Sequence, residues 1–93
     1  TASYTCEFFP PSADPRTEIT GERAGPIVVI GTTGDPSTPL ESSAAMADAL
    51  DEGVLVTVEA NRHTAYRSGS CINDVVHEYL IWLEPPGPDT RCP

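Results

Sequence analysis

The sequence contains no lysine, and all five of its basic residues are arginines, set against 14 acidic residues. The formal net charge at pH 7 is therefore −9. Proteins that bind nucleic acids along the phosphate backbone need stripes of basic side chains. This charge balance argues against a nucleic-acid partner.

Long apolar runs are also missing. No run approaches the roughly 18 residues that a membrane-spanning helix requires, and no signal-peptide pattern is visible. Hydrophobic residues make up 39% of the 93 residues, which is enough for one small globular core. The only methionine is Met46, and the chain opens with Thr1-Ala2-Ser3. We therefore expect a fragment or processed product without a membrane span.

The three cysteines, Cys6, Cys71 and Cys92, form no C-x-x-C pair. This excludes the usual zinc-ribbon and dithiol redox motifs. A zinc site built from His63, Cys71 and His77 would match no established ligand spacing, so we expect neither a metal nor a cofactor. One disulfide plus a cysteine paired elsewhere would suit a secreted protein, and three reduced thiols would suit a cytosolic one. The count alone leaves both open.

Residues 1–25 show no hydrophobic period and are interrupted by prolines. They predict an irregular, extended lead-in to a second region, residues 26–93. Within the lead-in, Phe8 and Phe9 form an apolar cluster that we expect to pack against another part of the protein.

Residues 26–93 alternate between strand and helix patterns. Two aliphatic runs, 26–31 and 54–58, predict strands buried on both faces, as in a parallel sheet. The alanine-rich segment 40–52, stopped by Gly53, predicts a helix, and residues 71–83 predict another with apolar positions at helical spacing. The order is βαβα, which places the fold in the α/β class. Two parallel strands leave both edges unpaired, so we expect the end of a larger sheet that dimerises or aggregates when isolated.

Asp35 lies in a glycine-flanked turn, residues 31–39, directly after the first predicted strand. Thr38 and Pro39, followed by Glu41, match a helix capping box with proline at the first helical position. Open α/β sheets hold their functional groups beyond the carboxyl ends of the strands. Asp35 is therefore a candidate functional carboxylate.

His63 follows the second predicted strand, 28 positions after Asp35. If the strands are parallel neighbours, both side chains project from the same edge of the sheet. An aspartate that accepts a hydrogen bond from one ring nitrogen leaves the other nitrogen free as a general base. Each residue also has a simpler interpretation, since aspartate in Gly-Asp-Pro commonly shapes a turn and a loop histidine can be merely solvated. Their shared placement favours an acid–base pair.

Three other side chains have plainer roles. We expect Tyr66 and Trp82 to pack, and His77 to lie at the solvent edge of the last helix.

These motifs together are similar to those of a known family. The run Gly31-Thr32-Thr33-Gly34-Asp35-Pro36-Ser37-Thr38-Pro39, then His63-Thr64-Ala65-Tyr66, Ser70-Cys71 and Arg91-Cys92, resembles the C-terminal segment of tripeptidyl aminopeptidase-like α/β-hydrolases. The resemblance covers residues 6–92. Members of this family are secreted or cell-envelope serine exopeptidases.

The resemblance implies roles for the candidate residues. Asp35 would be the acid and His63 the base of a catalytic triad, on the last two strands of the hydrolase sheet. The nucleophile motif G-x-S-x-G is absent from the chain. An N-terminal part of the same hydrolase would therefore supply the serine, and a peptide would be the substrate.

The resemblance also implies how the cysteines pair. Cys71, at the start of the last helix, would bond Cys92 in the tail. Cys6 would bond a cysteine outside the present chain.

Two functions remain as hypotheses. In the first, the chain is the C-terminal portion of a serine hydrolase, an exopeptidase that cleaves peptides by acyl transfer, and it is inactive alone. The alternative is a non-enzymatic, acidic, secreted binding module derived from such a hydrolase, which binds a partner through its exposed strand edge.

Overall fold

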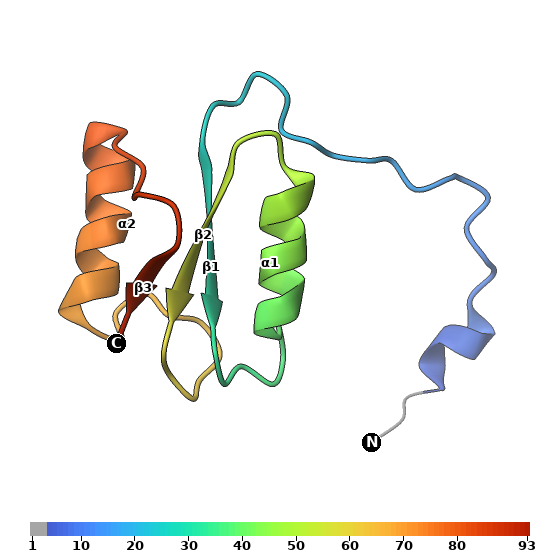
Figure 1. The fold of residues 1–93 in the computed structure, drawn as a ribbon. Helices are drawn as coiled ribbons and strands as arrows, with labels where there is room; N and C mark the ends of the chain where they lie inside the picture. Colours follow the sequence, from blue (N-terminus) through green and yellow to red (C-terminus); the bar gives the residue numbers. More distant parts are fainter. Residues whose placement is uncertain (1–3) are drawn as a thin grey trace.

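The computed structural model describes residues 4–93 and shows a three-stranded sheet flanked by two α-helices (Figure 1). Its elements, in chain order, are the 3₁₀ helix η1 (Thr5–Phe8), β1 (Ile27–Thr32), α1 (Leu40–Ala49), β2 (Gly53–Val58), α2 (Ser70–Trp82) and β3 (Thr90–Cys92). The α/β class predicted from the sequence is confirmed. Residues 1–3 of the predicted lead-in lie outside the described residues.

The central strand of the sheet is β2. It pairs in parallel with β1 along 27–32 and with β3 along 90–92. The sequence pattern predicted only two strands, and β3 was missed. A run of three residues is too short to show the alternation by which a strand is recognised. The outer edge of β1 has no partner strand among the described residues.

The two helices cover opposite faces of the sheet, because side chains alternate along each strand. Gly31 of β1 faces α1, since a Cβ atom at this position would lie 2.8 Å from the side chain of Leu40. Val56 and Val58 of β2 face the other way and form the core with Ile72 of α2. Figure 1 accordingly shows the strands running between α1 and α2.

Burial along the strands is uneven. The three carboxyl-terminal residues of β2 are buried, whereas the three amino-terminal residues are half-buried. In β1 the buried residues also concentrate toward the carboxyl end. The prediction of strands buried on both faces throughout was therefore wrong for their amino-terminal halves. The best-packed part of the sheet is the part that supports the two loops described below.

The start of α1 differs from the predicted capping box. Pro39 occupies the N-cap position, and no side chain caps the helix. The Pro39 carbonyl accepts the first helical hydrogen bond, from the Ser42 amide at 2.9 Å. The hydroxyl group of Thr38 instead donates to the carboxylate of Asp35 at 2.8 Å. The capping prediction was wrong because the helix begins one residue later than predicted, so that Pro39 and not Thr38 stands at the N-cap.

The end of α1 comes three residues earlier than predicted, at Ala49. The Asp51 amide donates to the carbonyl of Thr20 in the lead-in at 2.8 Å instead of continuing the helix. The chain then passes so close to the helix that a Cβ atom at Gly53 would overlap the carbonyl oxygen of Ala47. A contact from a remote segment therefore ends the helix.

Several large apolar side chains that the sequence pattern assigned to the interior are exposed. Phe8 and Phe9 are 85% and 68% exposed, and the row Leu80–Leu83 at the end of α2 is 64–80% exposed. The predictions that Phe8, Phe9 and Trp82 pack were wrong for the described residues. Helical spacing indicates which side chains share a face, but it carries no information about what covers that face.

A disulfide joins Cys71, in the first turn of α2, to Cys92 of β3, with 5.7 Å between their Cα atoms. Cys6 is exposed and has a free thiol. Because Cys71 is bonded, it is not available as the zinc ligand considered above. The bridge holds α2 to the edge of the sheet.

Removing this disulfide is expected to destabilise the fold. In the chain-entropy model, a bridge that spans a 21-residue separation contributes roughly 3 kcal/mol. The double variant Cys71→Ser/Cys92→Ser should lose about this much free energy of unfolding in urea denaturation without reductant. Cys6→Ser, at the exposed thiol, is the matched control and should change stability by less than about 0.5 kcal/mol. Equal stability of the double variant and the wild type would contradict this role.

Candidate active site

Two loops lie together at the carboxyl ends of β1 and β2: residues 33–39 and residues 59–69 (Figure 1). The Thr33 amide donates to the Val58 carbonyl, and the Gly34 amide donates to the Ala60 carbonyl, each at 2.9 Å. The parallel pairing of the strands thus continues past their ends. These bonds fix one loop against the other.

Two threonine hydroxyl groups add to this connection. Thr32 is 2% exposed, and its hydroxyl donates to the carbonyl of Arg62 at 2.8 Å, directly before His63. The hydroxyl of Thr33 accepts a hydrogen bond from the Ala60 amide at 3.2 Å. The sequence reasoning gave neither threonine a separate role. The available signal was a pair of hydroxyl side chains at the point where an otherwise aliphatic strand ends.

Gly34 allows the two loops to approach. A Cβ atom at this position would overlap Oδ1 of Asn61 and would lie 3.0 Å from its Cα atom. We expect Gly34→Ala to push the loops apart and to lower the free energy of unfolding by about 1–3 kcal/mol. Gly87→Ala is the matched control, because a Cβ atom there would meet nothing within 4 Å. If urea denaturation gives both variants the same free energy of unfolding, the close approach of Gly34 to Asn61 does not contribute to stability.

Asp35 is buried, 8% exposed, and its carboxylate is well supplied with donors. Its Oδ1 atom accepts the backbone amides of Ser37 and Thr38 at 2.9 and 3.1 Å, and Oδ2 accepts the Thr38 hydroxyl at 2.8 Å. Burial alone would raise the pKa of Asp35. Hydrogen bonds from the Thr38 amide, the His63 ring, the Thr38 hydroxyl and the Ser37 amide outweigh it and hold the pKa well below its ordinary value. The side chain is therefore ionised at neutral pH.

The ring of His63 lies directly against this carboxylate. Its Nδ1 atom is 2.9 Å from Oδ2 and 3.1 Å from Oδ1 of Asp35. An ionised carboxylate has no proton to donate, so the proton of this hydrogen bond belongs to Nδ1. In the neutral ring, Nε2 then carries the free lone pair. The side chain of His63 is 54% exposed, so this nitrogen can reach a reacting group.

A cavity of about 280 Å³ opens beside the pair. Asp35 and His63 line it together with aliphatic, aromatic and hydroxyl side chains, namely those of Ile30, Thr32, Thr38, Thr64, Ala65 and Tyr66. The structure thus brings together the two residues that the sequence singled out and places them at the edge of a space for a ligand. His77 lies elsewhere, at the exposed surface of α2.

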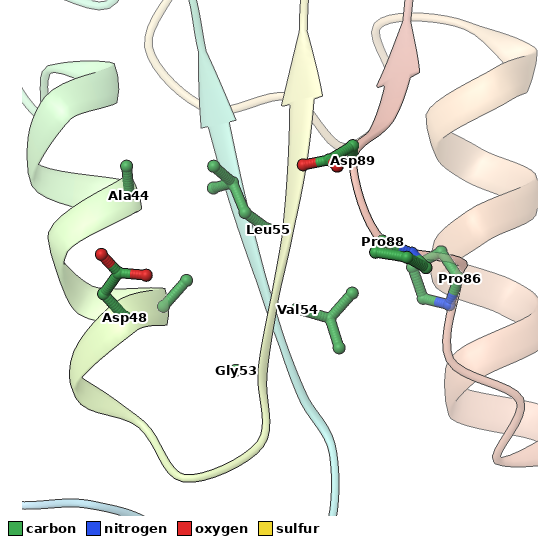
Figure 2. A pocket seen from close by; sticks show the side chains of 9 residues that line it. Ala44, Asp48, Gly53, Val54, Leu55, Pro86, Pro88 and Asp89 are labelled. Atoms are coloured by element: carbon green, nitrogen blue, oxygen red, sulfur yellow. The ribbon is translucent and has the colours of Figure 1, made fainter.

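A second cavity, of about 340 Å³, lies between α1, the amino-terminal half of β2 and residues 86–89 (Figure 2). Its charged lining residues are Asp48 and Asp89, and it has no histidine or cysteine. It therefore offers carboxylates without a paired histidine, unlike the cavity beside His63. Within residues 4–93, no three His, Cys, Asp or Glu side chains are grouped so that they could hold a metal ion. No helix of this region is both long and apolar enough to cross a membrane.

Comparison with known proteins places the chain in a family. A family model described as "TAP-like protein" matches residues 1–92. The chain belongs to this TAP-like family. It is 34% identical over 91 residues to serine protease Hip1 of Mycobacterium tuberculosis, a match that covers 95% of the chain and 17% of that protein. It is 36% identical over 70 residues to carboxylesterase B of the same species, covering 74% of the chain and 13% of that protein.

The TAP-like assignment agrees with the resemblance seen in the sequence. Both relatives are named as hydrolases, one a protease and one an esterase. The chain spans about 17% of the length of the protease. Peptide and ester cleavage by serine hydrolases share acyl-transfer chemistry, for which a histidine paired with a carboxylate is suited.

Proposed function

We propose that the chain supplies the acid and the base of a serine hydrolase whose nucleophile lies on another part of the polypeptide. The observation that carries this proposal is the hydrogen bond between Nδ1 of His63 and the buried carboxylate of Asp35. Membership of the TAP-like family supports it. The chain has no G-x-S-x-G motif, and among residues 4–93 no serine lines the cavity beside His63.

The chemistry follows from the two side chains. A serine hydroxyl attacks the substrate carbonyl, and its proton passes to Nε2 of His63. The negative charge of Asp35 stabilises the imidazolium and keeps the ring oriented. His63 then gives the proton to the leaving group as the carbon–leaving-group bond breaks. In the second half of the reaction, a water molecule attacks the acyl-enzyme carbonyl and gives its proton to Nε2 of His63. His63 returns this proton to the serine oxygen as the bond between acyl group and serine breaks, which releases the acid product.

The finer parts of the proposal concern substrate, partner and location. We propose an exopeptidase that acts on peptides, which the family supports, with the chain inert on its own. The partner is the N-terminal part of the same hydrolase, which would pair with the open edge of β1. The disulfide supports a secreted or cell-envelope location, because such bonds persist in oxidising compartments.

A chimera tests the proposal. The chain replaces the segment of serine protease Hip1 that aligns with it, and we call this protein the Hip1 chimera. The folded chimera is expected to hydrolyse a tripeptide p-nitroanilide, whereas the isolated chain should stay at the buffer rate. Turnover by the isolated chain at the chimera's rate, or a chimera that folds and has no activity, would contradict the proposal.

A pair of substrates that differ only at the amino terminus tests the exopeptidase assignment. A tripeptide p-nitroanilide with a free amino terminus should be cleaved, and the same compound with an acetylated amino terminus should not. Equal rates on the two compounds would contradict the exopeptidase assignment and would still be consistent with a serine hydrolase.

A further inference from the structure

Tyr66 lines the cavity beside His63, and its side chain contacts His77 of helix α2. The side chain is 46% exposed. Its phenolic oxygen lies 2.7 Å from Nε2 of His77 in α2. The two rings meet edge to face, with centroids 5.7 Å apart and planes at 78°. In the neutral state of His77, this nitrogen can accept the phenol proton, so the helix fixes how the ring of Tyr66 faces the cavity.

The turn that carries Tyr66 is strained. Thr64 and Arg67 have φ angles of 69° and 76°, in the left-handed region. This region is rare for residues other than glycine, and a β-branched threonine there is a genuine outlier. The Arg67 amide donates to Oδ1 of Asn73 in α2 at 2.8 Å, which holds the turn in place. Such strain persists only where the surroundings impose it, and it concentrates at sites that contact ligands.

Part of the cavity lining beside His63 is apolar. Ala65 is buried and Ile30 is half-buried, and both line the cavity with Tyr66. The remaining lining is polar and comes from Asp35, His63 and three threonines, Thr32, Thr38 and Thr64. Ligand sites commonly combine apolar lining with a few convergent polar groups. This combination suits a substrate whose reactive carbonyl lies at His63 and whose neighbouring side chain is apolar.

We propose that Tyr66 is a specificity-determining residue that contacts an apolar side chain of the substrate next to the scissile bond. His77 is a positioning residue, which acts by orienting the ring of Tyr66. The inference rests on the proposed function, because it assigns part of the substrate to the same cavity. Neither residue takes part in the proton transfers.

Steady-state kinetics of the Hip1 chimera test the inference. Two substrates are compared, with leucine or glycine as the residue whose carbonyl is attacked. Tyr66→Ala is expected to raise KM for the leucine substrate about tenfold, as loss of an aromatic contact implies. The KM for the glycine substrate and kcat for both should change less than about threefold. An equal rise in KM for the two substrates would overturn the inference.

The positioning role of His77 has a matched pair of variants. His77→Ala is expected to raise KM for the leucine substrate about threefold, as loss of one hydrogen bond implies. His77→Gln should restore the wild-type KM, because its amide oxygen can accept the same phenol proton. If glutamine does not rescue, or if kcat falls instead of KM rising, His77 does not act through Tyr66.

A binding measurement on the isolated chain separates this inference from the proposed function. N-acetyl-leucine amide at millimolar concentration is expected to shift the NMR signals of Ile30, Ala65 and Tyr66, and N-acetyl-glycine amide should not. Shifts in the chain together with an inactive chimera would overturn the proposed function and support the apolar subsite. No shift at Tyr66, or an active chimera whose leucine preference survives Tyr66→Ala, would overturn the inference and leave the proposed function standing.

Discussion

Replacing His63 with alanine in the Hip1 chimera is expected to lower kcat by about 10⁶-fold, the loss typical of removing a triad base. The imidazole is the proposed acceptor of the serine proton and the proposed donor to the leaving group, so both halves of the reaction lose their proton carrier. The KM should change little, because the missing group acts mainly in the transition state. Turnover of the tripeptide p-nitroanilide at saturating substrate measures the effect.

The chain offers an internal control, since it has only two histidines. The His77→Ala chimera lacks the other imidazole. Its kcat should stay within about threefold of that of the unmodified chimera, because His77 orients Tyr66 and takes no part in the proton transfers. A folded His63→Ala chimera that keeps more than about 1% of kcat would exclude His63 as the base, because single general-base effects exceed this factor.

Replacing Asp35 with asparagine is expected to lower kcat by about 10⁴-fold. The asparagine side chain can turn its NH₂ group toward Nδ1 of His63, which then has to accept a hydrogen bond instead of donating one. The proton moves to Nε2, the nitrogen that should take the serine proton. The fold should survive, because the shape of the side chain is retained. Asp48→Asn, at an exposed carboxylate of α1, is the matched control and should leave kcat unchanged.

The same substitution predicts a change in acid stability. The folded-state pKa of Asp35 is lowered, so its carboxylate stabilises the fold above the unfolded-state pKa of about 3.9. This contribution is lost as the pH falls below that value toward the folded-state pKa. In urea denaturation of the 93-residue chain, Asp35→Asn should therefore be less stable than the wild type at pH 7, and the gap should narrow below about pH 4. A gap that stays constant down to pH 2.5 would contradict the assignment.

The α/β class and the neighbouring placement of the two loops could be predicted from the sequence, because both depend on local patterns. Aliphatic runs flanked by turn residues mark β1 and β2, and a helix between two such strands makes them parallel neighbours. Parallel neighbours end at the same edge of the sheet. Asp35 and His63, each just past a strand, therefore had to lie close together.

The parts that escaped prediction depend on contacts between distant segments. β3 is a strand only because β2 offers its edge to residues 90–92. Thr38 matches a helix cap in sequence, yet its hydroxyl bonds to Asp35, whose position is set by the turn. The link from Thr32 to the carbonyl before His63 spans 30 positions. No local pattern encodes such a partner, and only the folded backbone brings it within reach.

The extended lead-in and the lack of lysine together determine how trypsin would digest this protein. Trypsin cleaves after lysine or arginine, which leaves five sites here, two of them, Arg16 and Arg23, in the exposed lead-in. The others lie in the connected loops or in β3: Arg62, Arg67 and Arg91. Cleavage should thus begin in the lead-in, and a cut after Arg16 keeps the Thr20 carbonyl that meets the end of α1. Brief digestion followed by mass spectrometry should yield a resistant core that retains Asp35, His63 and the disulfide.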